Sequence, residues 1–292
     1  MSETIYQMVT DKIVNLLERG TVPWRRTWVG GPSFELPVNL KTGHQYRGVN
    51  VILLVSAGYS SRFWLSFKQA QTLGGHVRRG ERGWPVIFWK RIEITDSKTG
   101  GPKEIPMLRF YRIFNVDQCE GIAGPDVPEP VLNEFTPVQK AEAIIAGMPN
   151  PPAIVHHEPR PYYRASTDTV NLPLPELFDS SQFYYAAGFH ELAHSTGHES
   201  RLNRRPSTAP RFFGDREYSK EELISEMASA FLCAEAKIEQ ATLEDTASYL
   251  SSWISVLKGT PKMAIKAASA AQAAADYILN NQNSQEVRNE ES

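Results

Sequence analysis

Apolar residues recur at two different spacings in the first 120 residues of this 292-residue chain. Spacings of three and four positions, typical of one face of an α-helix, end at glycines such as Gly20 and Gly74. Alternation of polar with β-branched and aromatic residues is typical of strands. The pattern predicts helices at residues 3–19, 49–57 and 67–73, and strands at residues 85–94 and 108–116 joined by a hairpin tip at residues 96–101.

The second half follows a segment rich in glycine and proline, residues 121–135, which is typical of a linker. Thr136, followed by Pro137 and then by Gln139, predicts a helix start with a capping box. The polar residues 281–292 predict a disordered tail. Between them the pattern predicts strands at 153–157 and 167–172, and helices from about residue 182, from residue 219, at 249–257 and at 263–279. We expect an α+β protein of two domains, residues 1–120 and 136–280.

Composition narrows the class of protein. Apolar residues make up 41% of the chain and charged residues 22%, which is typical of a globular protein. The apolar runs are too short to cross a bilayer, and the N-terminus has charged residues in place of the apolar core of a signal peptide. The two cysteines, Cys119 and Cys233, are too few for a disulfide framework. We expect a cytoplasmic protein with no membrane partner.

The net charge of −2 conceals an asymmetry along the chain. Residues 1–120 hold 17 Lys and Arg against 10 Asp and Glu, a net charge of +7. Residues 121–292 hold 14 against 23, a net charge of −9. Five of the six tryptophans also lie in the first 120 residues. A basic half rich in tryptophan and an acidic half suggest two functions on one chain.

The motif with the most chemistry lies in the acidic half, at His190-Glu191-Leu192-Ala193-His194. In a helix, a spacing of four places the two histidines one turn apart on the same face, so both imidazoles can reach one metal ion. Glu191 is then placed to act as the general base of a hydrolase. A helix with two solvated histidines is the simpler alternative, but the apolar neighbours favour a buried site. The motif predicts a metallopeptidase with Zn²⁺ or another divalent metal.

A zinc site of this kind needs a third protein ligand, and two positions soon after the motif are weak candidates. One class of zinc peptidase has histidine at the position of Ser200. His198 follows Gly197, which is expected to end the helix.

A glutamate further along the chain is the stronger candidate. Ser219 and Glu222 match a capping box, which assigns Glu222 to a helix start. Glu226 stands on the edge of an apolar stripe, where a carboxylate is costly unless a cation or hydrogen bonds balance it, although a solvated surface glutamate is the alternative. We therefore predict His190, His194 and Glu226 as the metal ligands.

The order of strands, HExxH helix and glutamate helix is that of a zincin-like domain. In that arrangement a strand at the edge of the sheet lies beside the metal, and an extended peptide can pair with it. Residues 168–173 are the candidate edge strand, with an ordinary interior strand as the equal alternative.

Aromatic and basic residues alternate in the first half, as in proteins that bind single-stranded DNA through stacked bases and phosphates. Each tryptophan alone is more often part of a core, and basic pairs are usually solvated surface, so their concentration carries the inference. Asn50 could add a hydrogen bond to a base or cap a turn. The residues predicted to contact DNA are Trp24, Arg25, Arg26, Tyr46, Arg47, Asn50, Lys68, Arg78 and Arg79.

Several short segments occur together in a family known to us. In the first half they are Val22-Pro23-Trp24 and residues 39–43, 46–50, 67–70, 80–83 and 114–118. In the second half they are Tyr162-Tyr163, Asp168 and residues 190–194, 200–202 and 221–226. In combination they resemble the ArdC-type antirestriction proteins over nearly the whole chain. Thr27, Ser66 and Ser225 depart from the residues expected there, and none is a predicted ligand.

The resemblance implies a protein of conjugative plasmids or related mobile elements that protects incoming DNA from restriction. It implies an N-terminal domain that binds single-stranded DNA and a C-terminal metal-dependent peptidase whose protein substrate is unknown. Carried over by position, the ligands would again be His190, His194 and Glu226, with Glu191 as the base. The alternative is a DNA-binding protein whose metal site is structural or vestigial. Glu191 favours the enzyme, because a structural site needs no unliganded carboxylate beside its histidines.

Overall fold

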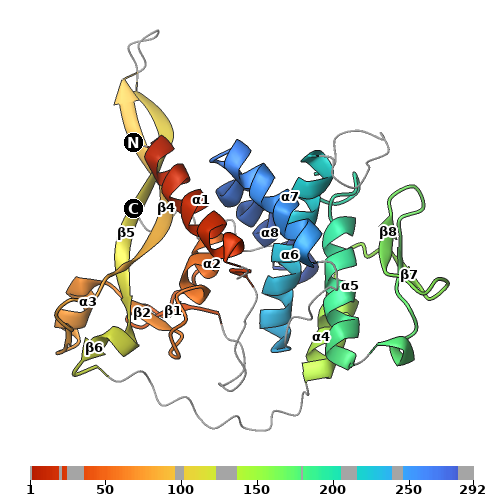
Figure 1. Cartoon of the computed structure of the whole chain (residues 1–292), viewed down its shortest axis with the longest axis horizontal. Helices are drawn as coiled ribbons and strands as arrows, with labels where there is room; N and C mark the ends of the chain where they lie inside the picture. Colours follow the sequence, from red (N-terminus) through yellow and green to blue (C-terminus); the bar gives the residue numbers. More distant parts are fainter. Residues whose placement is uncertain are drawn as a thin grey trace.

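The computed structural model of the chain describes residues 2–19, 22–24, 36–95, 102–122, 137–178, 180–204, 216–238 and 246–281. Figure 1 shows its elements in chain order. The first half contains α1 (Ser2–Glu18), β1 (Val38–Asn39), α2 (Val49–Val55), β2 (Phe63–Leu65), α3 (Phe67–Thr72), β3 (His76–Val77), β4 (Trp84–Thr95), β5 (Pro102–Asn115), the 3-10 turn η1 (Val116–Gln118) and β6 (Cys119–Glu120). The second half contains α4 (Pro137–Gly147), β7 (Ala153–Val155), β8 (Tyr162–Arg164), β9 (Thr169–Asn171), η2 (Pro175–Leu177), α5 (Ser181–Ser195), α6 (Arg216–Ala236), α7 (Thr246–Gly259) and α8 (Met263–Ile278).

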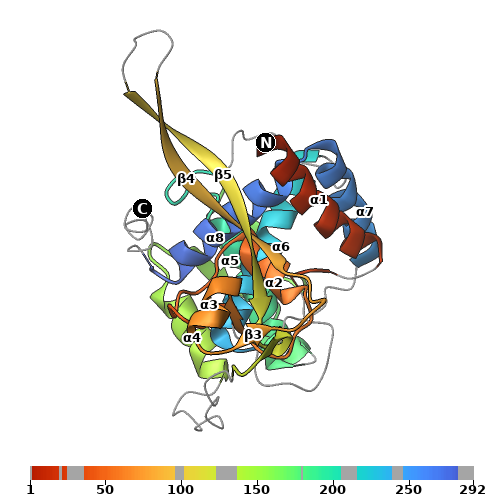
Figure 2. The same ribbon diagram turned by 90° about the vertical axis from the view of Figure 1, so that its left-hand side faces the viewer.

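A long two-stranded ribbon dominates the first half. Strands β4 and β5 pair without interruption from Trp84 opposite Ile113 to Thr95 opposite Pro102. The base of the ribbon joins β1 and β2 in a sheet of order β1-β2-β5-β4, and the ribbon then extends beyond the helices (Figure 2). β5 starts at Pro102, six residues before the expected start at 108. The expected hairpin tip, residues 96–101, lies outside the described residues.

The sheet of the second half is small and has the order β7-β9-β8. β9 pairs in parallel with β7 and antiparallel with β8, so it is the central strand. The expectation that residues 168–173 form the edge strand is therefore wrong. The edge strands are β7 and β8, and β8 packs beside α5.

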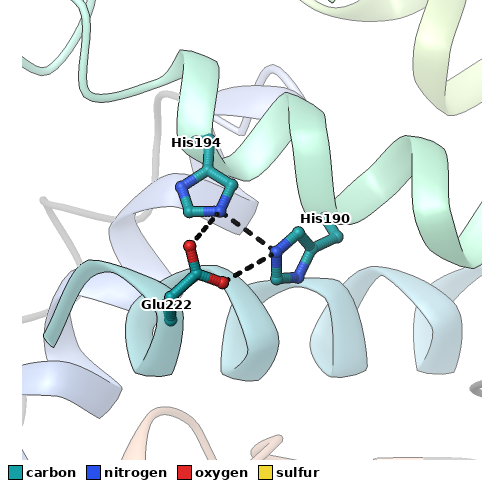
Figure 3. A group of neighbouring side chains, drawn as sticks. All are labelled: His190, His194 and Glu222. Atoms are coloured by element: carbon teal, nitrogen blue, oxygen red, sulfur yellow. Dashed lines mark hydrogen bonds and ion pairs between the residues drawn. The ribbon is translucent and has the colours of Figure 1, made fainter. Parts of the chain in front are cut away.

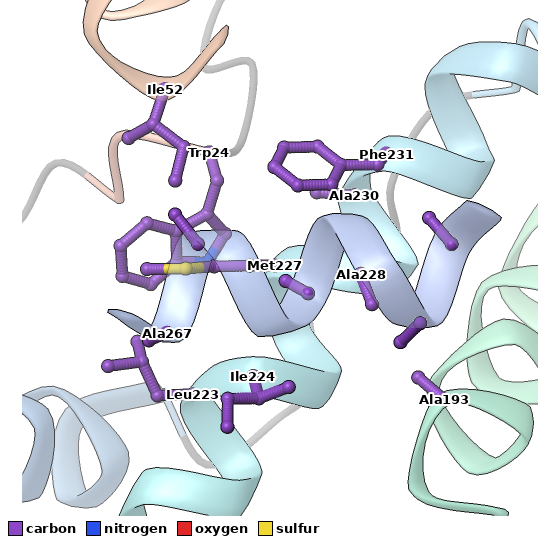
Figure 4. Packing of buried hydrophobic residues seen from close by; sticks show 14 of the residues in the cluster. Trp24, Ile52, Ala193, Leu223, Ile224, Met227, Ala228, Ala230, Phe231 and Ala267 are labelled. Atoms are coloured by element: carbon purple, nitrogen blue, oxygen red, sulfur yellow. The ribbon is translucent and has the colours of Figure 1, made fainter. Parts of the chain in front are cut away.

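One apolar core receives residues from both halves of the chain. Figure 4 shows Trp24 and Ile52 beside Met227 and Phe231 of α6. The indole of Trp24 meets that of Trp253 on α7 edge to face, with ring centroids 5.5 Å apart. Alanines cover much of α8, and small side chains let α6 approach it closely. The basic and acidic halves are thus packed against each other through buried side chains.

Polar contacts connect the same two halves at the surface. Arg47 forms an ion pair with Asp276 of α8, and the Gly48 N–H donates to Gln272 Oε1 over 2.9 Å. Thr10 Oγ1 donates to the Pro261 carbonyl over 2.7 Å. Among the described helices, none is both long enough and apolar enough to cross a membrane.

Candidate metal centre and nucleic-acid residues

Helix α5 carries the HExxH motif through the interior. Ser180 caps the helix, with its side-chain oxygen accepting from the Phe183 N–H over 3.3 Å. Residues 185–195 are all buried, and α5 packs lengthwise against α6 (Figure 1). Because residues 185–195 are buried on all sides, α5 has no clear polar face, and the motif lies away from bulk water.

Three buried side chains converge between α5 and α6, as Figure 3 shows. The Nε2 atoms of His190 and His194 are 3.0 Å apart. The Glu222 carboxylate lies against both, with Oε2 3.4 Å from His190 Nε2 and Oε1 3.4 Å from His194 Nε2. One ligand atom from each of the three residues lies within 4.8 Å of the others. Two imidazoles and a carboxylate at this separation suit a single divalent ion.

Two further glutamates and a serine of α6 face the opposite nitrogens of the imidazoles. Glu226 Oε2 lies 3.4 Å from His190 Nδ1, without hydrogen-bond geometry. Ser225 Oγ lies 3.0 Å from His194 Nδ1, and Glu221 Oε1 lies 3.7 Å from the same atom. These groups are placed to orient the rings, as outer carboxylates and hydroxyls do at metal sites.

The structure brings together His190, His194 and Glu222 but not Glu226. The expected helix start at Ser219 is wrong, because α6 already begins at Arg216 and Ser219 lies inside it. Glu222 is consequently not a capping residue. The sequence contained a usable signal, since Glu222 and Glu226 are one turn apart on the same face. Only the position of α6 along α5 determines which carboxylate reaches the Nε2 atoms.

An arginine supports the outer side of the site. Arg204 donates to Glu221 Oε1 over 2.8 Å, to Thr196 Oγ1 over 2.6 Å and to the Ala193 carbonyl over 3.0 Å. It therefore joins the end of α5 to α6. Burial alone would raise the pKa of Glu221, but its contacts with His194 and Arg204 lower that pKa to about 2.

The electrostatics of the three converging residues agree with a cation site. Burial would raise the pKa of Glu222, but the two imidazoles beside it hold that pKa well below its usual range. Burial would lower the pKa of His190, and Glu222 and Glu226 raise it instead. A buried carboxylate between two imidazoles is balanced either by protons on the rings or by a metal ion. The donor set therefore fits a divalent metal.

Glu191 lies beside this site with its own polar partner. It is buried, and burial raises the pKa of its carboxyl group. The backbone N–H of Tyr163 on β8 donates a hydrogen bond to it. Glu191 thus stands between the imidazoles and the edge strand. A carboxylate in that position can take a proton from a water molecule beside the imidazoles.

An ion pair and a hydrogen bond connect the loop after α5 to the β7-β9-β8 sheet. Arg201, whose side chain is fully buried, forms an ion pair with Asp168, and Tyr163 Oη donates to Asp168 Oδ1 over 2.8 Å. His198, the alternative ligand, lies in this loop, with Nδ1 2.8 Å from Ser200 Oγ. It is not part of the converging group.

Two of the aromatic residues predicted to stack on DNA are buried. Trp24 is 3% exposed and packs in the shared core. Tyr46 is 5% exposed, and its hydroxyl contacts Asn39 Nδ2 at 3.3 Å and also bonds to Tyr111. Neither ring presents a face to solvent on which a base could stack.

Three further predicted residues have partners within the protein. Arg47 pairs with Asp276, as described above. Asn50 joins α2 to β4, because its side chain donates to the Ile87 carbonyl over 2.8 Å and accepts from the Ile87 N–H over 2.7 Å. Arg78 is exposed but pairs with Glu81 at 3.0 Å. Of the other predicted residues, Lys68 and Arg79 are exposed, and Arg25 and Arg26 lie outside the described residues.

Two family models match the chain. Residues 139–270 match the model described as zincin-like metallopeptidase, and residues 3–116 match the N-terminal domain of anti-restriction factor ArdC. The fold is similar to crystal structures of the antirestriction ArdC protein from the R388 plasmid. The metal-free structure is 36% identical with a TM-score of 0.77, covering 96% of this chain and 98% of that one. The Mn(II)-bound structure is 33% identical with a TM-score of 0.74, covering 98% and 99%.

Sequence relatives match nearly the whole of this chain. The uncharacterized protein y4eC of Sinorhizobium fredii is 35% identical, covering 98% of this chain and 94% of its own. The DNA primase TraC of Escherichia coli is 35% identical over 96% of this chain. The chain spans only 27% of that primase and 20% of a second TraC. The fold and site thus define a two-domain α+β protein with a zincin-like metallopeptidase domain. The chain belongs to the ArdC family of antirestriction proteins.

Proposed function

We propose that this chain binds single-stranded DNA with its basic half and hydrolyses peptide bonds at the site between α5 and α6. We further propose His190, His194 and Glu222 as the ligands of a Zn²⁺ ion, with Mn²⁺ as the alternative metal. The observation that carries the peptidase proposal is the convergence of these three buried side chains with Glu191 beside them. The protection of transferred DNA that the family name implies is the context in which both activities would act.

Each residue of the site has a separate task in this proposal. A divalent ion bound here would polarise the substrate carbonyl and acidify water. The three ligands hold their position because α5 and α6 are buried and because Ser225 and Glu226 lie at the far nitrogens of the rings. Glu191 accepts the proton from the attacking water and returns it to the leaving amine.

The edge strand β8 supplies a place for the substrate backbone. It is one of the two outer strands of the β7-β9-β8 sheet, and the Tyr163 N–H on it donates to Glu191. An extended peptide that pairs with β8 would lie alongside both Glu191 and the ligand set. This arrangement supports a peptide substrate rather than a small molecule. The side chains around β8 would then determine which peptide sequences are cleaved.

Replacing Glu191 by Gln tests the enzymatic part. The ligands remain, so metal content should equal that of the wild type, whereas cleavage in a proteomic screen should be lost. Glu199→Gln serves as the control, since Glu199 is an exposed glutamate just beyond α5. A variant Glu191→Gln that keeps wild-type cleavage would refute the assignment of the base. Protection of DNA by Glu191→Gln at the wild-type level would favour the alternative, in which the metal site is structural and occlusion of DNA is the whole activity.

A further inference from the structure

Among the residues that the structure describes, most of the exposed aromatic side chains lie on the β4–β5 ribbon. Of the eight large apolar side chains that are exposed among the described residues, four lie on it. Single exposed apolar residues are ordinary, but a cluster on one narrow element marks an interaction site. The four are Phe88, Trp89, Phe110 and Tyr111, which are 39%, 56%, 42% and 44% exposed.

Strand register separates these rings into two faces. Phe88 is opposite Arg109, and Val86 is opposite Tyr111, so Phe88, Tyr111 and Arg109 share one face of the ribbon. Lys90, two residues after Phe88, lies on that face as well. Trp89 and Phe110 belong to the other face. We call the first group, Phe88, Lys90, Arg109 and Tyr111, the ribbon face.

The two rings of the ribbon face are held in a fixed arrangement. Phe88 and Tyr111 meet edge to face, with centroids 5.4 Å apart and planes at 60°. The Tyr111 hydroxyl bonds to buried Tyr46, which fixes the ring at its polar end and leaves the remainder exposed. Trp89 and Phe110 have no such ring contact among the described residues. Rings that are fixed in advance lose little entropy when a ligand stacks on them.

Charge on the ribbon complements a polyanion. Residues 84–113 contain six Lys and Arg and three Asp and Glu, a net charge of +3. Lys90 is exposed beside the ring pair, and Arg109 lies directly opposite Phe88. Aromatic faces flanked by cations bind unpaired bases and their phosphates, whereas paired bases in a duplex do not present their faces.

We propose that the ribbon face is the surface on which single-stranded DNA stacks. This inference rests on the proposed DNA-binding function and assigns it to residues other than Trp24, Tyr46, Arg47 and Asn50, which the fold already engages. Bases would stack on Phe88 and Tyr111, and their phosphates would lie against Lys90 and Arg109. Binding would show little preference for base sequence, since every base has a stacking face.

The test uses the full chain and a fluorescent oligo(dT) in an anisotropy titration. The first variant, Phe88→Leu, keeps an apolar side chain on the strand but removes the ring. The second variant is Tyr111→Leu, because Tyr111→Phe would keep the ring. Each should weaken binding about tenfold, because stacking on one ring contributes roughly that factor. Phe67→Leu on α3 is the matched control. Phe67 is an aromatic residue that is 50% exposed, and its ring meets Phe114 near the base of β5 rather than the ribbon face, so the variant should bind as the wild type.

Cross-linking of bromouracil-substituted oligonucleotide to the wild-type chain checks the result without any substitution. Adducts should form at Phe88 or Tyr111. Wild-type affinity in both Leu variants, or adducts confined to α3, would overturn the ribbon face while leaving DNA binding intact. A wild-type chain that does not bind single strands would overturn the proposed function as well. Equal affinity for duplex DNA, or capture of a protein in place of DNA, would overturn the choice of ligand.

Discussion

Replacing each of three neighbouring glutamates of α6 separates the metal ligand from the groups around it. Glu222 faces both Nε2 atoms at 3.4 Å, whereas Glu226 faces His190 Nδ1 and Glu221 faces His194 Nδ1. All three are buried. The change from Glu to Gln keeps the shape of the side chain and removes its charge, so differences among the variants reflect position rather than volume.

The expected magnitudes follow from these positions. Zinc held by four ligands has an apparent binding free energy of about 10–16 kcal/mol, so one ligand contributes roughly 3–4 kcal/mol, or about 100- to 1000-fold in affinity. An outer group that orients a ligand contributes about 10- to 100-fold. We expect Glu222→Gln to fall in the first range and Glu226→Gln and Glu221→Gln in the second.

The assay is competition for Zn²⁺ with a chromophoric chelator at one fixed pH. Circular dichroism of the metal-free variants verifies that the helices remain. A larger loss of affinity in Glu226→Gln than in Glu222→Gln would refute the reasoning, and it would restore Glu226 as the ligand. Equal and small losses in all three would show that the carboxylates do not bind the metal.

Three other predictions concern the fold. Trp24→Ala should lower the free energy of unfolding in urea by about 3–5 kcal/mol, because it leaves a cavity beside Trp253. A variant with wild-type stability and only weakened DNA binding would contradict this. Burial alone would raise the pKa of Asp168, but Arg201 and Tyr163 lower it, so the pair stabilises the fold above pH ~4 and this contribution is lost as the pH falls further. Asp168→Asn should therefore lower the free energy of unfolding by about 2 kcal/mol at pH 7, which is less than the loss of a fully buried ion pair because Asp168 is 32% exposed. The difference in free energy of unfolding between variant and wild type should shrink toward pH 3. A fragment of residues 1–122 should show no cooperative melting, since α1 and Trp24 lose the helices that cover them; a sharp transition would show that the basic half folds alone.

Periodicity in the sequence was enough to predict most helices. α1, α2, α3, α7 and α8 lie where spacings of three and four indicated, because apolar residues recur at those spacings along each of them. The short strands β1 and β8 were missed, since each is shorter than one full alternation, whereas β7 and β9 lie within the predicted strands 153–157 and 167–172. Because β8 was missed, β9 was expected at the edge of the small sheet, although it is the central strand.

One part of the candidate site could be predicted from local sequence and the other part could not. His190, Glu191 and His194 could be identified because their relation is local, within one turn of one helix. The choice between Glu222 and Glu226 depends on how far α6 slides along α5, which no local pattern contains. Exposure posed a similar problem for the aromatic residues. The sequence does not show that Trp24 is buried in the core shared by the two halves while Phe88 is exposed on the ribbon.

Anomalous diffraction from crystals of the full chain soaked with Zn²⁺ tests the central claim most directly. The account predicts one strong peak between α5 and α6, about 2.0–2.2 Å from both Nε2 atoms and from a Glu222 oxygen. Glu191 should lie near the peak without binding it. A peak on the Nδ1 side of His190 beside Glu226, or no peak at a zinc concentration that saturates binding in solution, would contradict the account.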